Sequence, residues 1–442
     1  RKQPKFFDVV TWTGNAVSGR QISHSLGSTP GCIIIKCTST SGLNWLVLHR
    51  GTNTPYQNLL YLNLTNAANG TAYSQFSATD TYFTVSDGQV ANGSGDTYVA
   101  YLFAHNAGGF GLTGTDNVIS CGSYTTDSSG NASVTLGYEP QWLMTKISTT
   151  TGDWRIIDNM RQMSLTNNFF LYPNTSGAEV DNTFATWQPN ATGFTHNQAN
   201  ANQTFIYIAI RRGPMKTPTT GTSVFSPTIW TGNGTTGRTL ATGLSSPPDM
   251  AITQWRNGTQ SNLLWDKLRG FSTTAGGYSE YLRTPSTGGG SAIANYFYIP
   301  DMVNFGFGAI AAGSQQSNGS GETLVGWSFA RAPSFFDEVC YTGTGAVRTL
   351  NHNLAVAPEM MIVKVRGANS GSWRVYHSAL GPTKLITLNL TNAAATLSTI
   401  WNDTAPTSSV FTVGTYGEVN LSGDTFVAYL RSEEHTSELQ SH

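Results

Sequence analysis

Charged side chains are scarce in this chain, since Asp, Glu, Lys and Arg make up 11% of its 442 residues. An average soluble protein has roughly 25%. The formal net charge is −1, so there is no excess of positive charge that would bind nucleic acid or an anionic membrane surface. No apolar run approaches the roughly 18 residues of a membrane-spanning helix. We therefore expect no nucleic-acid partner and no membrane insertion.

Cysteine is scarce as well, and its four positions, Cys32, Cys37, Cys121 and Cys340, follow no common spacing. A disulfide or zinc site that stabilised a repeated module would recur with that module. We therefore expect buried free thiols, and we expect neither a metal nor a cofactor.

Glycine is abundant, with 47 residues, and serine, threonine and asparagine accompany it. This composition is typical of short strands that are joined by tight turns. Strand-like runs such as Tyr98–Phe103 carry apolar residues on both faces, which suits a central strand that is covered on both sides. No long amphipathic helix is evident, and the sequence predicts an all-β fold.

An internal repeat is the strongest signal in the sequence. Leu62-Asn-Leu-Thr-Asn-Ala-Ala68 recurs identically at 388–394, and Phe6-Phe7-Asp8 recurs as Phe335-Phe336-Asp337. These offsets accommodate three periods of ~109 residues, a length typical of one β-sandwich. A proline before a hydrophobic strand marks the same place in each period, at Pro30, Pro140, Pro248 and Pro358.

The repeat predicts a tandem array of about four antiparallel β-sandwich modules, jelly-roll or lectin-like, of ~109 residues each. Module 1 spans residues 1–105, a linker plus module 2 spans 106–213, a linker plus module 3 spans 214–331, and module 4 spans 332–430. Both ends interrupt the pattern, so we expect the chain to be an internal part of a longer array.

The last twelve residues, 431–442, read Arg-Ser-Glu-Glu-His-Thr-Ser-Glu-Leu-Gln-Ser-His. They resemble the translation of a DNA sequencing adapter. We interpret 431–442 as an artefact that takes no part in the fold, and we expect it to pack against nothing.

Histidines recur at two module positions, which are His24 with His352, and His49 with His377. At the second position modules 2 and 3 have Asp158 and Asp266 instead. An exchange of His for Asp, without ligand spacing, favours a polar surface site over a metal or catalytic site. A glycanase would need two carboxylates about 5–9 Å apart, and no acidic pair recurs with the modules. We predict no catalytic residue and no enzyme activity.

Three tryptophans, Trp45, Trp154 and Trp373, share one module position and are the candidates for ligand binding. An exposed indole could stack on a sugar ring. A tryptophan within a strand more commonly faces the core, and the alternation of Trp373 with Val375 favours an inner sheet face. We expect these rings to be buried within their own modules, with glycan binding as the alternative.

The motifs Phe6-Phe-Asp-Val-Val10, Ile22-Ser-His-Ser-Leu-Gly27 and Thr97-Tyr-Val-Ala-Tyr-Leu-Phe103 carry a family resemblance. The chain resembles large repeat-containing structural or tail-fibre-like proteins of tailed bacteriophages, common in marine metagenomes. Their repeats belong to a domain of unknown function. The resemblance implies a component of the virion, extracellular when assembled, whose partners are other virion proteins, and it assigns no catalytic residue.

Three functions are compatible with these observations. The first is a non-enzymatic virion structural or tail-fibre-like protein, in which the modules serve as spacers and for surface display. The second is an adhesin that binds a host-surface glycan or receptor. The third, a tailspike-type glycanase, is disfavoured by the low content of acidic residues. Formation of a homo-oligomer stays open.

Overall fold

The structure is a computed structural model of the chain. It describes residues 2–432 except 112–113, 160, 162, 164–167, 183–184, 198–199, 214, 216–217, 219, 236, 245, 271, 273–277, 295–296, 300–303, 308–316 and 368. Strands dominate the described residues, and the helices among them are single turns. The prediction of an all-β fold is confirmed. Among these residues no helix is long and apolar enough to cross a membrane.

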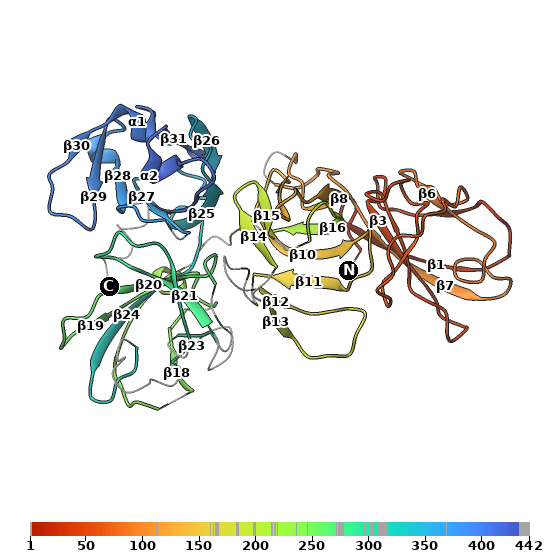
Figure 1. Ribbon diagram of the computed structural model, residues 1–442, viewed down its shortest axis with the longest axis horizontal. Helices are drawn as coiled ribbons and strands as arrows, with labels where there is room; N and C mark the ends of the chain where they lie inside the picture. The colour runs from red at the N-terminus through yellow and green to blue at the C-terminus, as the bar shows by residue number, and fades with distance from the viewer. Residues whose placement is uncertain are drawn as a thin grey trace. The chain divides into compact units, whose positions relative to one another are not determined.

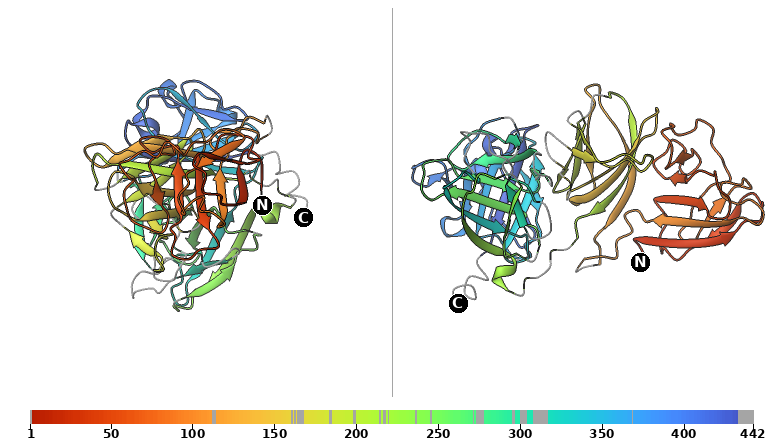
Figure 2. Two further views of the ribbon diagram at one scale, coloured as in Figure 1. Left: turned by 90° about the vertical axis from the view of Figure 1, so that its right-hand side faces the viewer. Right: turned by 90° about the horizontal axis from the view of Figure 1, so that it is seen from below.

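Four large antiparallel sheets follow one another along the chain and repeat one strand order (Figure 1). In each, the first strand pairs with the last, the last with the third, and the third with the fourth. We call the corresponding stretches segments 1 to 4, running from β1 to β7, β8 to β16, β17 to β24 and β25 to β32. Figure 2 shows the same sheets from two further directions.

The large sheet of segment 1 has the order β1 (Phe7–Thr13), β7 (Thr97–Phe103), β3 (Cys32–Cys37), β4 (Leu46–His49) and β5 (Leu60–Tyr61). A small sheet of β2 (Arg20–Ser23) and β6 (Tyr82–Val85) packs on it. Tyr98, Ala100 and Leu102 of β7 are buried, whereas the residues between them are half-buried. This alternation follows from the two-residue period of a strand. β7 lies between β1 and β3 in the sheet, so it is a central strand, as predicted.

Segment 2 has a large sheet of β8 (Ile119–Thr125), β16 (Thr204–Arg211), β10 (Pro140–Ile147) and β11 (Trp154–Asp158). Its smaller sheets are formed by β14 (Thr186–Asn190), β15 (Gly193–Asn197) and β9 (Asn131–Thr135), and by β12 (Asn168–Phe170) and β13 (Val180–Asn182).

Segment 3 follows the 3-10 turn η1 (Gly221–Ser223). Its large sheet contains β17 (Phe225–Thr231), β24 (Thr323–Phe329), β19 (Met250–Trp255), β20 (Leu263–Asp266), β21 (Tyr278–Arg283) and β22 (Ser291–Ala294), and its small sheet contains β18 (Arg238–Ala241) and β23 (Asn304–Phe307).

Segment 4 has a large sheet of β25 (Phe336–Thr342), β32 (Thr425–Arg431), β27 (Met360–Val365), β28 (Arg374–His377), β29 (Lys384–Thr387) and β30 (Ala395–Thr396). A small sheet of β26 (Arg348–Asn351) and β31 (Val410–Val413) packs on it. The helical turns are η2 (Ser378–Leu380), α1 (Ser398–Trp401) and α2 (Gly417–Asn420).

One glycine position explains part of the repeat. Gly14, Gly232 and Gly343 each follow the first strand of a large sheet, where the backbone of the loop before the last strand passes very close. A Cβ atom at these positions would overlap the carbonyl oxygen of Gly93, Gly319 or Leu421, respectively. Only glycine permits this approach, so the residue recurs for a steric reason.

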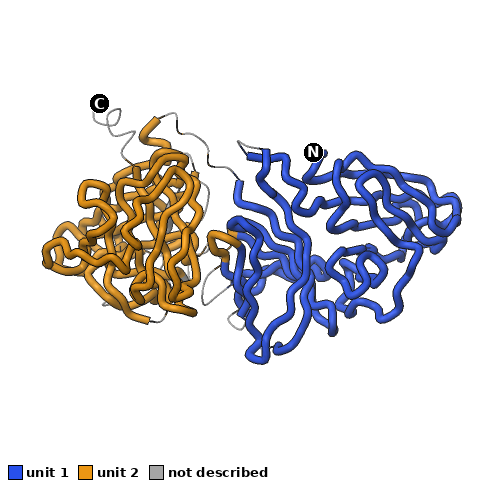
Figure 3. Tube along the Cα trace, turned by 90° about the horizontal axis from the view of Figure 1, so that it is seen from above, with its two compact units in different colours: residues 1–158, 166–188, 193–213 blue, residues 159–165, 189–192, 214–442 orange. Residues whose placement is uncertain are grey.

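The chain divides into two compact units (Figure 3). Unit 1 comprises residues 1–158, 166–188 and 193–213 and holds segments 1 and 2, apart from a few residues. Unit 2 comprises residues 159–165, 189–192 and 214–442 and holds segments 3 and 4. In each unit one cluster of buried apolar residues draws members from both segments.

The expectation that 431–442 packs against nothing is wrong at its first two residues. Arg431 continues β32 and pairs with Phe336 and Met360, and Ser432 is buried, with its backbone N–H donated to the carbonyl oxygen of Phe335. A strand pairs through its backbone whatever its side chains are, so the pattern of side chains could not place its end. Residues 433–442 lie outside the described residues.

Candidate functional site

The three repeated tryptophans lie in two different environments. Trp154 and Trp373 are buried, with 1% and 0% of their surface exposed, whereas Trp45 is half-buried. Burial was predicted for all three rings within their own modules. At Trp154 and Trp373 the ring is instead covered by the neighbouring segment of the same unit, so both are closed to a sugar ligand in this chain.

In unit 1, Trp154 of segment 2 contacts the end of β5 in segment 1. Its indole N–H donates to the carbonyl oxygen of Tyr61 at 2.9 Å. The Nζ of Lys146 donates to the carbonyl oxygen of Thr65 at 3.2 Å, and the backbone N–H of Gly152 donates to the same oxygen at 2.8 Å. Three donors of segment 2 therefore converge on one loop of segment 1.

In unit 2, segment 4 docks on segment 3 through the same three donors. The indole N–H of Trp373 donates to the carbonyl oxygen of Ser286 at 3.1 Å. The Nζ of Lys364 and the backbone N–H of Gly371 both donate to the carbonyl oxygen of Thr287, each at 2.8 Å. A backbone carbonyl accepts these bonds in both units, so the contact does not require a particular side chain on the loop.

Burial changes the ionisation of the two lysines. Burial lowers the pKa of Lys146 to about 8, against the opposing charge of Asp153. Burial, together with the positive charge of Arg269, lowers the pKa of Lys364 to about 8. Their ammonium groups are held in the contact by hydrogen bonds to carbonyl oxygens, such as that from Lys364 to Gly371 at 2.7 Å.

An asparagine fixes the backbone at each tryptophan. The side-chain oxygens of Asn63, Asn174 and Asn389 accept the backbone N–H of Trp45, Trp154 and Trp373, at 2.9, 3.0 and 3.0 Å. The amides of Asn63 and Asn174 also donate to the side chains of Asn44 and Asp153. The asparagine therefore positions the strand rather than a ligand.

The prediction that the repeated His and Asp positions lie on the surface is wrong at three of them. His49, His352 and Asp266 are buried. The Nε2 of His49 lies 3.1 Å from the carbonyl oxygen of Tyr207 in segment 2, and the hydroxyl of Tyr429 in segment 4 donates to Asp266 at 2.6 Å. At His49 and Asp266 a strand end that would be exposed in an isolated module is thus interior in the pair of segments, whereas His352 is buried within segment 4, with its Nε2 3.0 Å from the carbonyl oxygen of Thr407.

The three other positions are more open. His24, Asp158 and His377 are partly exposed. The ring nitrogen Nδ1 of His377 accepts the backbone N–H of Ala379 at 3.2 Å and so caps the turn η2. His377 therefore acts as a cap, and His49 and Asp266 as contacts between segments.

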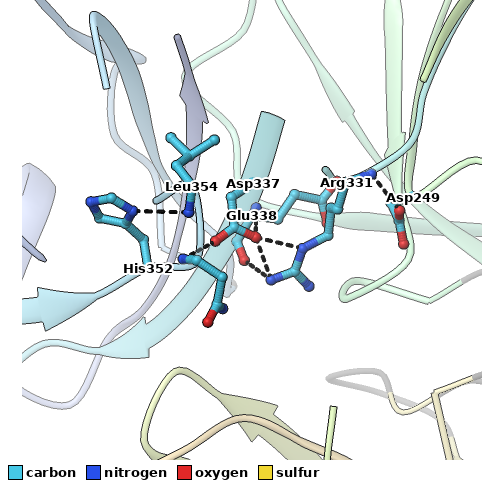
Figure 4. Close-up of polar contacts among 7 residues, drawn as sticks. Asp249, Arg331, Asp337, Glu338, His352 and Leu354 are labelled. Carbon is cyan, nitrogen blue, oxygen red and sulfur yellow. Dashed lines mark hydrogen bonds and ion pairs between the residues drawn. The ribbon is translucent and has the colours of Figure 1, made fainter. Parts of the chain in front are cut away.

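A buried group of charged residues lies where segment 3 joins segment 4 (Figure 4). The guanidinium of Arg331 donates to Asp337 through Nε at 2.7 Å and forms an ion pair through Nη2 at 2.6 Å. Asp337 also accepts the backbone N–H of Glu338 and of Asn353. The backbone N–H of Arg331 donates to Asp249 at 2.6 Å. These contacts fix the junction by charge-assisted hydrogen bonds.

Sequence reasoning missed this group, although a signal was present. Asp337 belongs to the repeated Phe-Phe-Asp motif, and its equivalent Asp8 accepts the backbone N–H of Val9 and of Ser25 and pairs with Lys2 at 3.2 Å. A basic residue precedes the aspartate by six positions in both places. The pairing could have been read from that spacing.

Glu338 is fully buried beside this group, and neither of its carboxylate oxygens has a hydrogen-bond partner. Burial raises its pKa well above the ordinary value, and the negative charge of Asp266 raises it further, against the opposing effect of Arg331. A neutral carboxyl is therefore favoured in the folded chain.

The remaining candidates for chemistry are occupied in structural contacts. All four cysteines are buried, as predicted. A pocket of about 480 Å³ beside α2 is lined in part by Glu418 and Asp424, but Glu418 binds Arg374 and Asp424 binds Asn369. Within the described ranges, no three His, Cys, Asp or Glu side chains are grouped so that they could hold a metal ion.

The contacts pair segment 1 with segment 2 and segment 3 with segment 4, and the comparison with known families gives the same grouping. A domain of unknown function, DUF7483, matches residues 2–214 and again residues 220–438. The chain belongs to this family. Each DUF7483 copy spans two segments, so the family counts two copies where the repeat in the sequence predicts four modules. Neither a curated protein nor a solved structure matches the chain.

Proposed function

We propose that this chain is a non-enzymatic structural protein of a tailed-phage virion, in which DUF7483 copies act as spacers that display the surface of a tail fibre or a similar appendage. The observation that carries the proposal is the use of the repeated residues. The repeated tryptophan and lysine pack one segment against the next, as Trp154 with Lys146 in unit 1 and as Trp373 with Lys364 in unit 2. A repeat whose distinctive residues hold neighbours together suits a stacked spacer.

The resemblance to repeat-containing phage proteins supports the virion as the location, with other virion proteins as partners. The scarcity of charge supports the same reading, because 11% charged residues is a composition more common in extracellular and virion β-proteins than in cytosolic enzymes.

An adhesin that binds a host-surface glycan is the second candidate, and one observation favours it. Trp45 is half-buried while its two counterparts are buried, so segment 1 alone retains an accessible indole at the candidate position. A sugar could stack on that ring.

The location can be tested by mass spectrometry of density-banded particles of a phage that encodes the chain. We expect its peptides in intact particles at a stoichiometry comparable with that of other tail proteins. Peptides found only in the soluble fraction of the lysate would contradict a virion role. Binding of the purified chain to a glycan array, lost in Trp45→Ala, would favour the adhesin over the spacer.

A further inference from the structure

Segment 1 carries the docking residues that segments 2 and 4 use, although no segment of the described chain occupies them. Lys36 and Trp45 are the counterparts of Lys364 and Trp373. The Nζ of Lys36 lies 5.8 Å from the centre of the Trp45 ring, against 5.9 Å in segment 4. Trp45 stacks on Tyr101 at 6.4 Å, and Trp373 stacks on the equivalent Tyr429 at 6.5 Å. Lys36, Trp45 and Tyr101 therefore have the same mutual arrangement as their counterparts in segment 4, which is docked on segment 3.

The hydrogen-bond donors of this face are open. Among the described residues, the indole N–H of Trp45 and the backbone N–H of Leu43 meet no acceptor, and Lys36 donates only to the carbonyl oxygen of Leu43. In segment 4 the counterparts of all three donate to segment 3. We call Lys36, Leu43, Trp45 and Tyr101 the docking face.

Segment 4 carries the matching loop. Leu388–Ala394 has the same sequence as Leu62–Ala68, the loop of segment 1 that receives Lys146 and Gly152 through the carbonyl oxygen of Thr65. In segment 1 the second leucine of the loop, Leu64, is half-buried, whereas its counterpart Leu390 is 51% exposed. We call Leu388–Ala394 the docking loop.

Segment 3 shows that the docking residues do not simply accompany the fold. β19 and β20 pair Thr253 with Leu263, which places Gln254 and Asn262 where the other segments have lysine and tryptophan. The strand order is unchanged without them. A sheet of this kind therefore forms without the pair, and its presence in segment 1 calls for a use outside the segment.

We propose that two copies of this chain associate head to tail, the docking face of one copy binding the docking loop of the second as segment 2 binds the loop of segment 1. Trp45 then loses its remaining exposure and donates to the carbonyl oxygen of Thr387 of the second copy, and Lys36 donates to that of Thr391. Buried tryptophans commonly dominate the energy of such contacts. The contact is heterologous, so its repetition gives a filament or a closed ring.

Sedimentation velocity of the full chain tests the proposal. We expect the sedimentation coefficient of the unmodified chain to rise with concentration over about 1–100 µM, the range of weak protein contacts. Trp45→Ala removes the face and Leu390→Asp removes the loop, and each variant should remain monomeric over the whole range. An equimolar mixture of the two should form dimers and nothing larger, because each dimer retains one intact face bound to one intact loop.

Two controls separate docking from folding. Leu421→Asp changes a leucine of equal exposure, 50%, outside the docking loop and should associate like the unmodified chain. The double variant Lys36→Gln, Trp45→Asn introduces the residues that segment 3 has at these positions, Gln254 and Asn262. Because the same sheet forms with these residues in segment 3, the double variant should be monomeric with an unchanged circular dichroism spectrum. A chain that stays monomeric at the highest concentration, or a mixture of the two variants without dimers, overturns the proposal. Glycan binding by a monomer, lost in Trp45→Ala, overturns it in favour of an adhesin.

Discussion

The indole N–H of Trp154 donates to the carbonyl oxygen of Tyr61 at 2.9 Å across 93 residues of chain. Trp373 makes the equivalent bond to Ser286 at 3.1 Å across 87 residues. The acceptors differ in residue type, but both are backbone carbonyls at the end of a strand or in the loop that follows it. The repeated tryptophan is thus the link between two consecutive segments, and its partner changes freely because only a carbonyl is needed.

Replacing the linking tryptophans should destabilise one unit at a time. Trp154→Ala should lower the melting transition of unit 1 alone, and Trp373→Ala that of unit 2 alone, because each ring is buried within one unit. Loss of a buried tryptophan costs about 3–5 kcal/mol. For a unit of this size, each kcal/mol lowers the melting temperature by about 2–4 °C. Differential scanning calorimetry of the full chain measures both transitions.

Trp45→Ala is the matched control for this experiment, because the half-buried ring of Trp45 lies at the same position of the repeat without a covering segment. Its effect on the transition of unit 1 should be clearly smaller than that of Trp154→Ala. Equal losses at the three positions would mean that the ring stabilises its own sheet and not the contact between segments.

Arg331 and Asp337, both shown in Figure 4, form an ion pair in which each side chain neutralises the charge of the other. Arg331 and Asp337 are both buried, at an Nη2 to Oδ1 distance of 2.6 Å. Removing one member of such a pair leaves a buried charge and costs about 3–5 kcal/mol. Arg331→Met and Asp337→Asn should each destabilise unit 2 by this amount in urea unfolding. The double variant should lose less than the sum of the two.

The equivalent pair in segment 1 gives the control. Lys2 and Asp8 lie 3.2 Å apart, but the side chain of Lys2 is 63% exposed. An exposed pair contributes about 0–1 kcal/mol, so Lys2→Met should hardly change the stability of unit 1. If Arg331→Met were equally mild, the buried pair would not be what holds the junction in unit 2.

Much of the fold could be predicted from the sequence, because the evidence for it is local. The alternation in Thr97–Phe103, the recurring prolines and the repeated glycines each depend on a few neighbouring residues. The strands that follow Pro30 and Pro248 do occupy one place in their sheets. The repeat itself fixed the order of the segments along the chain.

The contacts between segments could not be predicted in the same way. The identical loops at 62–68 and 388–394 and the shared tryptophans were visible, but nothing local says that a tryptophan of one segment meets the loop of another. The partners of Lys146 and Trp154 are backbone carbonyls, which leave no trace in the residue type. For the same reason the sequence predicts His49 and Asp266 at the surface, although the neighbouring segment buries them.

Glu338→Gln should remove a dependence of stability on pH in unit 2. The pKa of Glu338 is raised in the folded chain by burial and by the charge of Asp266. Between the ordinary pKa and the raised one, the folded state binds more protons than the unfolded state, so stability falls as pH rises through this window. Glutamine cannot ionise. The free energy of unfolding of the variant, relative to the unmodified chain, should therefore increase from pH 5 to pH 8 in urea titrations.

A constant difference between the two proteins over that range would mean that Glu338 is solvated in the folded state. Glu322→Gln, which changes a half-buried glutamate just before β24 in the same unit, is the control for the substitution itself.

His49 should make unit 1 sensitive to acid. Burial, with a smaller effect of Arg50, lowers the pKa of this imidazole to about 3. Its Nδ1 accepts the backbone N–H of Gly51 at 2.9 Å, which leaves Nε2 as the donor to the carbonyl oxygen of Tyr207. The contact with Gly51 needs the neutral ring, because a proton on Nδ1 would meet the N–H of Gly51, whereas Nε2–H can donate to Tyr207 in either form of the ring. Protonation therefore breaks the contact with Gly51 and places a charge on a ring that is buried between segments 1 and 2.

The sign of the effect follows from the two pKa values. An unfolded histidine takes up a proton near pH 6.5, whereas His49 in the folded chain stays neutral down to about pH 3. Between these values the unfolded state binds more protons, so unit 1 loses stability as the pH falls, by up to about 1.4 kcal/mol per pH unit for one group.

His49→Gln keeps an N–H donor for Tyr207 and cannot titrate. Urea unfolding of unit 1 between pH 6.5 and pH 4.5 should show a slope that is shallower by nearly one proton in this variant than in the unmodified chain. Equal slopes for His49→Gln and the unmodified chain would show that the fold does not lower the pKa of His49.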